Sequence, residues 1–134
     1  MEPRSIRLPG THGLHLHALE WSREGTLLLF LHGFSNDAHV WGWVAPVLAP
    51  HYRVVALDQR GHGDSDRDPE GRYDHETMAR DANAAIESLG ASRAVIVGHS
   101  LGGRVAMRFA GLFPEKLAGL VIVDSAPDLD ARGT

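Results

Sequence analysis

The stretch Gly98–Gly103, with the sequence GHSLGG, constrains the fold of this chain more than any other. It follows a short apolar run, Ala94–Val97, and it opens a segment whose apolar residues have helical spacing. A G-x-S-x-G pattern in that setting is typical of a strand that turns sharply into a helix and presents its serine at the edge of a sheet. Such a turn strains the backbone of Ser100, so its neighbours must be small. Gly98 and Gly102, two positions to either side, meet that need.

The rest of the chain alternates short apolar runs with helical patterns, after an N-terminal hairpin formed by Ser5–Leu8 and His15–Trp21. This alternation predicts an α/β fold with a mostly parallel sheet and helices on both faces. The strands predicted from residue 26 onward are Thr26–Leu31, Arg53–Leu57, Arg93–Val97 and Gly119–Val123. The predicted helices are Asp74–Leu89, Leu101–Phe113 and an irregular Val40–Leu48, with Trp41, Val44, Val47 and Leu48 on one face and Pro46 inside it.

Composition narrows the class of protein. The 134 residues suit one domain, and 43% apolar with 22% charged residues is typical of a globular chain. A net charge of -4 without a basic cluster argues against nucleic acid or an anionic membrane as a partner. Cysteine is absent, which excludes a thiolate zinc site and a cysteine nucleophile. Neither a signal peptide nor a membrane-spanning run is visible, so we expect a cytoplasmic location.

A serine in such a turn is a candidate nucleophile, and that role demands further groups. The hydroxyl needs an adjacent base, and the carbonyl oxygen that it attacks needs hydrogen-bond donors. The backbone N–H of Leu101, at the start of the following helix, is one candidate donor. The second is the backbone N–H of Phe34, where the apolar strand ending at Leu31 turns. Both turns lie at the carboxyl ends of strands, where open α/β sheets bind ligands.

These motifs together resemble the N-terminal half of an α/β-hydrolase fold serine hydrolase. The matching segments are Leu31-His32-Gly33-Phe34, Asp58–Ser65 (DQRGHGDS), Gly98–Gly103 and Val121–Asp124, and the match runs from about Ile6 to Pro127. The resemblance implies that Ser100 is the nucleophile and that Phe34 and Leu101 form the oxyanion hole. It implies supporting roles for His32, Gly33, Gly98, His99 and Gly102. It also implies that Arg60, Gly61, His62 and Gly63 shape a loop beside the site.

The sequence does not supply a catalytic base at the position where the family has one. In the family the triad follows the order serine, acid, histidine, and no histidine occurs after His99. Asp124 is a candidate acid, as in the minority of relatives that place it one strand early. We therefore expect residues 1–134 to be the N-terminal portion of a single α/β-hydrolase domain, lacking the C-terminal strands and cap. A complementary C-terminal fragment, or self-association along the bare edge strand Gly119–Val123, would then complete the sheet.

Other assignments stay open for the histidines and acids. His32 or His62 could act as a rearranged base, although bracing a loop through backbone hydrogen bonds is the more ordinary role for each. Structural packing is expected for His99, and Asp58 is expected to brace the loop that follows it. Asp64, Asp66 and Asp68 begin like a calcium loop, but Pro69 and His75 stand where glycine and glutamate are needed. His12, His15 and His17 suit an exposed polar face better than a metal site, so no metal or cofactor is expected.

The sequence thus predicts a serine hydrolase of small ester-like substrates, such as carboxylic esters or lactones, acting through an acyl-enzyme on Ser100. The serine argues against the dehalogenase and epoxide hydrolase branches of the family, which use an aspartate at this position. The alternative is a non-catalytic binding module, or pseudoenzyme, built on the same half of the fold. Such a module would keep the pocket and offer the Gly119–Val123 edge to a partner strand.

Overall fold

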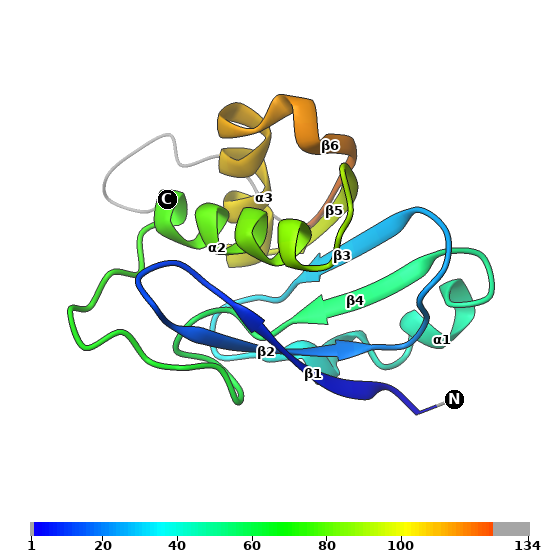
Figure 1. The fold of residues 1–134 in the computed structure, drawn as a ribbon, viewed down its shortest axis with the longest axis horizontal. Helices are drawn as coiled ribbons and strands as arrows, with labels where there is room; N and C mark the ends of the chain where they lie inside the picture. Colours follow the sequence, from blue (N-terminus) through cyan, green and yellow to red (C-terminus); the bar gives the residue numbers. More distant parts are fainter. Residues whose placement is uncertain (1, 125–134) are drawn as a thin grey trace.

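A computed structural model describes residues 2–124, and their centre is a six-stranded sheet (Figure 1). The strands are β1 (Arg4–Pro9), β2 (His15–Glu20), β3 (Leu27–Leu31), β4 (Arg53–Leu57), β5 (Ala94–His99) and β6 (Leu117–Val123). The helices are α1 (Ala45–Leu48), α2 (His75–Ser88) and α3 (Leu101–Leu112), with the 3-10 turns η1 (Ala38–Trp41) and η2 (Pro114–Lys116). The predicted α/β architecture is confirmed. Residues Ser125 to Pro127, at the end of the matched stretch, lie outside the described part.

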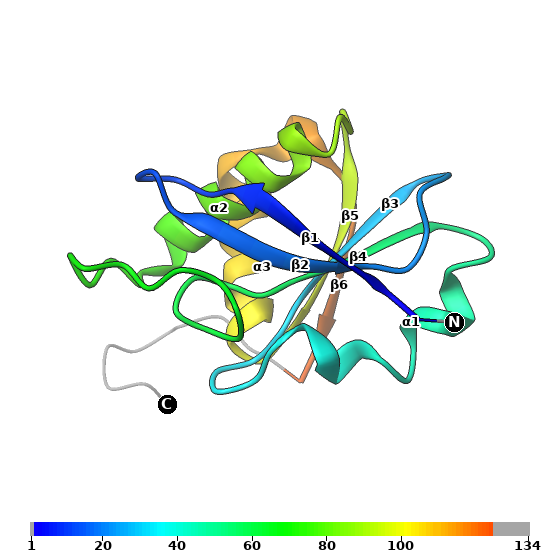
Figure 2. The ribbon, with the colours of Figure 1, turned by 60° about the horizontal axis from the view of Figure 1, so that its bottom comes forward.

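The strand order is β1-β2-β4-β3-β5-β6, and the twist of the sheet is clear in Figure 2. The β1–β2 hairpin and the β2–β4 pair are antiparallel, whereas β3 pairs in parallel with both β4 and β5. All five residues of β3 are buried, as expected of a central strand with both faces covered. In the register, Leu31 of β3 lies opposite Gly98 of β5, so the turns that follow these two strands emerge side by side.

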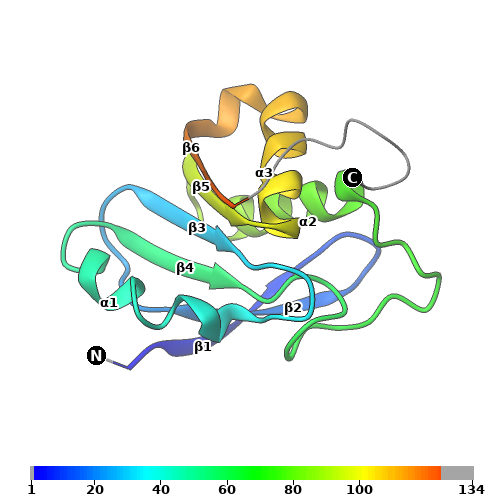
Figure 3. The ribbon, with the colours of Figure 1, turned by 180° about the vertical axis from the view of Figure 1, so that it is seen from behind.

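Helices cover both faces of the sheet, as predicted (Figure 3). On one face α2 and α3 pack on the sheet in a core that includes Met78, Ile86 and Phe109. On the other face η1 and α1 pack on β3 and β4 in a smaller core around Phe30 and Trp41, whose ring centroids are 4.8 Å apart. Helix α2 begins where the sequence places it, because the Asp74 side chain accepts a hydrogen bond from the N–H of Thr77.

The prediction of a single helix over Val40–Leu48 is wrong, because the structure has two separate short elements there. The Asp37 side chain caps η1 by accepting from His39 N–H, which starts the helical turn two residues early, and η1 ends at Trp41. Helix α1 begins separately, with Pro46 in its first turn, where a missing N–H costs no hydrogen bond. Because of this break the four apolar residues do not share a face: Trp41 is buried, whereas Val47 is 68% exposed.

One edge of the sheet is β6, which pairs only with β5 within residues 2–124. Leu120, Val121 and Val123 are 38%, 46% and 41% exposed. This confirms the predicted apolar edge, although the strand begins two residues earlier than expected. None of the helices in the described part is long and apolar enough to cross a membrane.

Candidate active site

Ser100 sits at the predicted elbow between β5 and α3 in a strained conformation. Its backbone has φ +53° and ψ −116°, a region that residues with a Cβ rarely adopt. A Cβ on Gly98 would collide with the carbonyl of Gly102, and a Cβ on Gly102 would collide with the carbonyls of Leu31 and His32. The two glycines therefore let the first turn of α3 press against the ends of β5 and β3. The side chain of Ser100 is left exposed.

The turn after β3 lies directly beside Ser100. A Cβ built on Gly33 would stand 3.3 Å from Cβ of Ser100 and 3.1 Å from Nδ1 of His99, so the main chain at Gly33 faces both residues. The N–H of Asn36 donates to the Gly33 carbonyl at 3.1 Å and closes the turn. Phe34 follows Gly33 with its side chain 75% exposed. The predicted groups at the ends of β3 and β5 are thus brought together.

The end of β6 joins the same edge. The backbone N–H of Ser100 donates to the carbonyl of Val123 at 3.2 Å, and His99 is paired with Val123 in the register. Asp124 follows Val123 with an exposed side chain and φ +50°. The candidate acid therefore lies at the strand end next to that of the candidate nucleophile.

Backbone strain gathers at this edge of the sheet. Among the described residues, four that are not glycine have positive φ: His12, Ser35, Ser100 and Asp124. The last three follow the carboxyl ends of β3, β5 and β6. Strained backbone of this kind persists where surrounding structure enforces it, and it concentrates at functional sites. The three turns therefore identify the candidate site independently of any motif.

His32 is fully buried and both of its ring nitrogens are engaged. Nδ1 donates to the carbonyl of Gly33 at 2.8 Å, and Nε2 accepts from the N–H of Gln59 at 3.0 Å. Burial lowers the pKa of His32, and the hydrogen bond to Gly33 only partly opposes that shift. The ring is a neutral brace between the turn after β3 and the loop after β4. It offers no nitrogen to a catalytic serine, which removes His32 as the base.

His62 also braces backbone, as expected. Its Nδ1 donates to the carbonyl of Arg60 at 3.0 Å. Its ring packs on His32, with centroids 4.9 Å apart, and edge-on against Phe34 at 5.9 Å. The loop after β4 thereby contacts the turn that carries Phe34.

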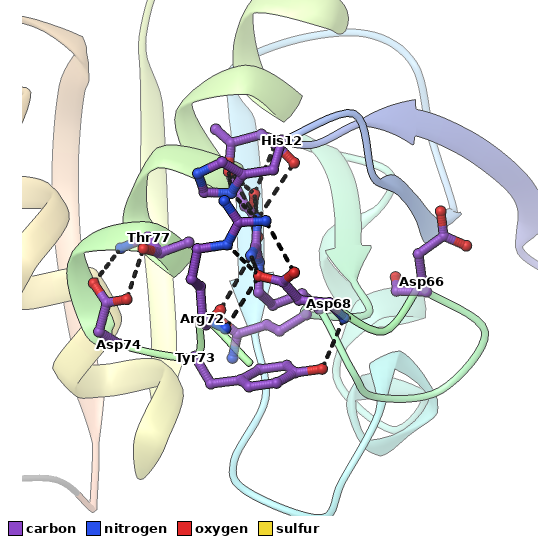
Figure 4. A network of polar contacts seen from close by, with 12 residues as sticks. His12, Asp66, Asp68, Arg72, Tyr73, Asp74 and Thr77 are labelled. Atoms are coloured by element: carbon purple, nitrogen blue, oxygen red, sulfur yellow. Dashed lines mark hydrogen bonds and ion pairs between the residues drawn. The ribbon is translucent and has the colours of Figure 1, made fainter. Parts of the chain in front are cut away.

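A buried ionic cluster anchors that loop, as expected for Arg60, but the acidic partners of Arg60 were not predicted from the sequence (Figure 4). Arg60, which is fully buried, donates to Asp81 of α2 at 2.7 Å, to Asp68 at 2.9 Å and to Thr11 at 2.8 Å. The side-chain hydrogen bond from Arg72 lowers the pKa of Asp68 far below its ordinary value. One arginine thus ties the loop to α2 and to the turn between β1 and β2. The sequence signal for this cluster was Asp81, a charged residue on the apolar stripe of α2.

Asp58 braces its surroundings as predicted. Its carboxylate accepts from the N–H of Ala38 at 2.7 Å, from the N–H of Asp64 at 3.0 Å and from Nδ1 of His17 at 2.8 Å. Burial raises the pKa of Asp58, but these three hydrogen bonds outweigh burial and hold the pKa below its ordinary value.

A possible metal-binding group shares these residues. Ligand atoms of His17, Asp58 and Asp64 lie within 4.8 Å of one another. The protein's own hydrogen bonds already engage both oxygens of Asp58 and both nitrogens of His17, whose Nε2 lies 2.9 Å from the hydroxyl of Ser5. The group therefore acts as a brace.

Comparison with known proteins agrees with the fold described above. The family model described as "alpha/beta hydrolase fold" matches residues 26–132. A fluoroacetate dehalogenase from Burkholderia sp is 41% identical over 109 residues, covering 78% of this chain and 36% of the relative. Epoxide hydrolase B from Mycobacterium tuberculosis is 38% identical over 120 residues, covering 86% and 34%.

A solved structure of a thermophilic esterase from Thermogutta terrifontis superposes with a TM-score of 0.84 at 30% identity. That match covers 96% of this chain and 48% of the esterase. The chain therefore spans under half the length of these relatives, and their names refer to three different reactions. These relatives and this chain share one fold. The chain belongs to the α/β-hydrolase fold family.

Proposed function

We propose that this chain carries the nucleophile and oxyanion hole of a serine hydrolase that acts on small ester or lactone substrates by acyl transfer. The observation that carries the proposal is the strained, exposed Ser100 with the Gly33–Phe34 turn against it. A serine held at a costly backbone conformation, with a second main-chain turn packed on it, is the arrangement that acyl transfer needs.

Two backbone donors would hold the negative charge that develops on the carbonyl oxygen. The N–H of Leu101 is the first of α3, at the positive end of the helix dipole. The N–H of Phe34 follows Gly33, whose main chain faces Ser100. One donor of this kind typically contributes about 3–4 kcal/mol to transition-state stabilisation. His32 supports this role by fixing the Gly33 carbonyl, so that the turn cannot rotate freely.

The chemistry of serine favours esters over the substrates named for two of the relatives. Attack of a serine oxygen on a carbonyl expels an alcohol and leaves an acyl-enzyme, an ester that water can cleave. Attack on a saturated carbon that bears fluorine or an epoxide oxygen would leave an ether, which water does not cleave. A carboxylate nucleophile avoids this problem because it leaves an ester. Ser100 therefore supports ester or lactone hydrolysis for this chain.

The histidine base is proposed to come from a C-terminal half of the domain. His32 is excluded by its two hydrogen bonds, and the family order places the histidine after the serine and the acid. Asp124 would be the acid if its carboxylate meets that histidine at the edge formed by β5 and β6. The histidine would take the proton of Ser100 and later activate the water that releases the acyl group.

The experiment that tests this proposal adds imidazole to the buffer as the base. A fluorophosphonate probe phosphorylates an activated serine: Oγ attacks phosphorus, fluoride leaves, and a base takes the hydroxyl proton. We expect imidazole in the buffer to accelerate labelling of Ser100, measured by intact mass, and Ser100→Ala to abolish it. An oxyanion hole alone retains roughly 10³-fold catalysis over water. Labelling no faster than that of a surface serine would instead favour the non-catalytic binding module.

A further inference from the structure

A pocket opens at the edge of the sheet opposite the candidate active site. Strands β3, β4 and β5 are parallel, and Ser100 follows the carboxyl end of β5, whereas this pocket lies at the amino ends of the strands. Its volume is about 530 Å³. The turn before β3, the loop between α2 and β5, and the starts of β4 and β6 line it. The pocket is therefore separate from the site proposed for acyl transfer.

The charged residues that line the pocket are both arginines. Arg53 is the first residue of β4 and Arg93 immediately precedes β5, so the two flank the start of β3, which pairs with both strands. No acidic side chain lines the pocket within the described part of the chain. The exposed residues Thr26 and Ser92 add two hydroxyl groups to its lining. Guanidinium and hydroxyl groups at one concavity suit a ligand with negatively charged oxygens.

Main-chain contacts hold the two guanidinium groups in place. Nη1 of Arg53 donates to the carbonyl of Leu89 at 2.8 Å, and Nη2 of Arg93 donates to the carbonyl of Leu117 at 3.2 Å. A guanidinium carries several N–H donors, so one such bond leaves others for a ligand. Arg93 has no acidic partner within residues 2–124. Side chains that are already ordered lose less conformational entropy when they bind a ligand.

The net charge beside the pocket is positive, although the whole chain carries a net charge of -4. The buried carboxylate of Glu20 lies 3.5 Å from Nη2 of Arg53, but it also pairs with Arg4 at 2.9 Å and with Arg23 at 3.2 Å. One carboxylate therefore faces three guanidinium groups. Glu24, in the turn before β3, adds one more negative charge and leaves positive charge in excess. That excess attracts an anion to this edge of the sheet.

We propose that this pocket binds the phosphate group of a small phosphorylated molecule. A phosphate monoester carries about two negative charges at neutral pH, which match two guanidinium groups that flank one strand end. The volume of about 530 Å³ lies in the range of small-molecule sites and leaves room for more than a phosphate group. Gly25 and Gly90 also line the pocket, and a Cβ on Gly90 would meet nothing within 4 Å. The rest of the molecule therefore fits beside the arginines.

Isothermal titration calorimetry of the full 134-residue chain tests this proposal with glucose 6-phosphate, inorganic phosphate, glucose and acetate at constant ionic strength. We expect the two phosphate compounds to bind, and glucose and acetate to bind weakly or not at all. Arg93→Gln should weaken the binding of glucose 6-phosphate about tenfold or more, because it removes a charged donor. Arg67→Gln is the matched control, since Arg67 is also exposed and donates to one main-chain carbonyl, that of Gly61, on the loop after β4. That variant should leave binding unchanged.

A further variant separates the pocket from the candidate active site, whose oxyanion donors would also attract phosphate. Phe34→Pro removes one of those donors and should bind glucose 6-phosphate as the parent chain does, so the outcome does not depend on the proposed function. Broadening of the phosphorus NMR signal of glucose 6-phosphate gives a second measure of binding. The proposal is overturned if neither measurement detects binding, or if Arg67→Gln and Arg93→Gln weaken it equally. Acetate that binds as tightly as phosphate, or binding lost only in Phe34→Pro, would also overturn it.

Discussion

The ring of His32 accepts a hydrogen bond from the backbone N–H of Gln59 at 3.0 Å while it donates to the carbonyl of Gly33. This neutral ring joins the turn beside Ser100 to the loop that follows β4. Two segments 27 residues apart in sequence are held together at the edge where the candidate site lies. A proton on Nε2 would replace the acceptor with a donor and break the link to Gln59.

His32 is therefore expected to make stability depend on pH. A histidine whose folded-state pKa lies below its ordinary 6.5 binds fewer protons when folded, so the free energy of unfolding falls as pH drops below 6.5. The contribution is fully present above pH 6.5. In His32→Gln this dependence should flatten, because the amide does not titrate. The amide oxygen can still accept from Gln59, so the link is kept. Urea unfolding between pH 5 and 7.5 measures it, and equal slopes for both proteins would contradict the assignment.

Gly102 is expected to be intolerant of any side chain. Its Cβ would collide with the backbone of Leu31 and His32, which cannot rotate away as a flexible side chain could. Gly102→Ala should lower the free energy of unfolding by about 1–3 kcal/mol or more. Gly111 lies on the same helix with open space around it, so Gly111→Ala should be neutral or stabilising by up to about 1 kcal/mol. Similar losses for both substitutions would refute the close approach of α3 to β3.

Asp81 is expected to hold the buried Arg60 cluster together. Asp81→Asn leaves a guanidinium inside the protein with its charge only partly compensated, and breaking such a buried pair typically costs about 3–5 kcal/mol. The control is Glu76→Gln on the same helix, since Glu76 pairs with Arg80 and Arg108 at the surface. That variant should unfold at nearly the parent urea concentration. A small effect of Asp81→Asn would show that solvent reaches the cluster.

Phe34 is expected to act through its backbone rather than its exposed ring. Phe34→Pro removes the N–H and should slow imidazole-assisted phosphonylation of Ser100 by about 10²–10³-fold. Phe34→Ala keeps the N–H and, because the ring is 75% exposed, should change the rate little. Circular dichroism checks that the proline variant is folded. Equal rates for the two variants would remove Phe34 N–H from the proposed oxyanion hole.

Local sequence was sufficient to predict those elements whose own residues specify their conformation. The elbow was predictable because a strand-serine-helix junction demands glycine at positions 98 and 102, and both are indispensable in the structure. Helix α2 was predictable because Asp74 caps it and its apolar residues repeat at helical spacing. Strand β4 was predicted with its observed limits, Arg53–Leu57, because a short apolar run with β-branched residues between polar segments is typical of a buried strand.

Other features needed the tertiary structure. The start of η1 depends on a single cap by Asp37, which competed successfully with the apolar pattern of residues 40–48. The partners of Arg60 come from three distant segments, and sequence order does not determine which acid meets a buried cation.

Sequence by itself determined the family, the elbow and the candidate nucleophile, because each rests on short-range demands of backbone geometry. Only the tertiary structure decided that His32 is a brace rather than a base, because the identity of its hydrogen-bond partners depends on how β3 and β4 align. The fold also decided that Arg53 and Arg93 line one pocket, since the order of strands in the sheet determines which strand ends become neighbours.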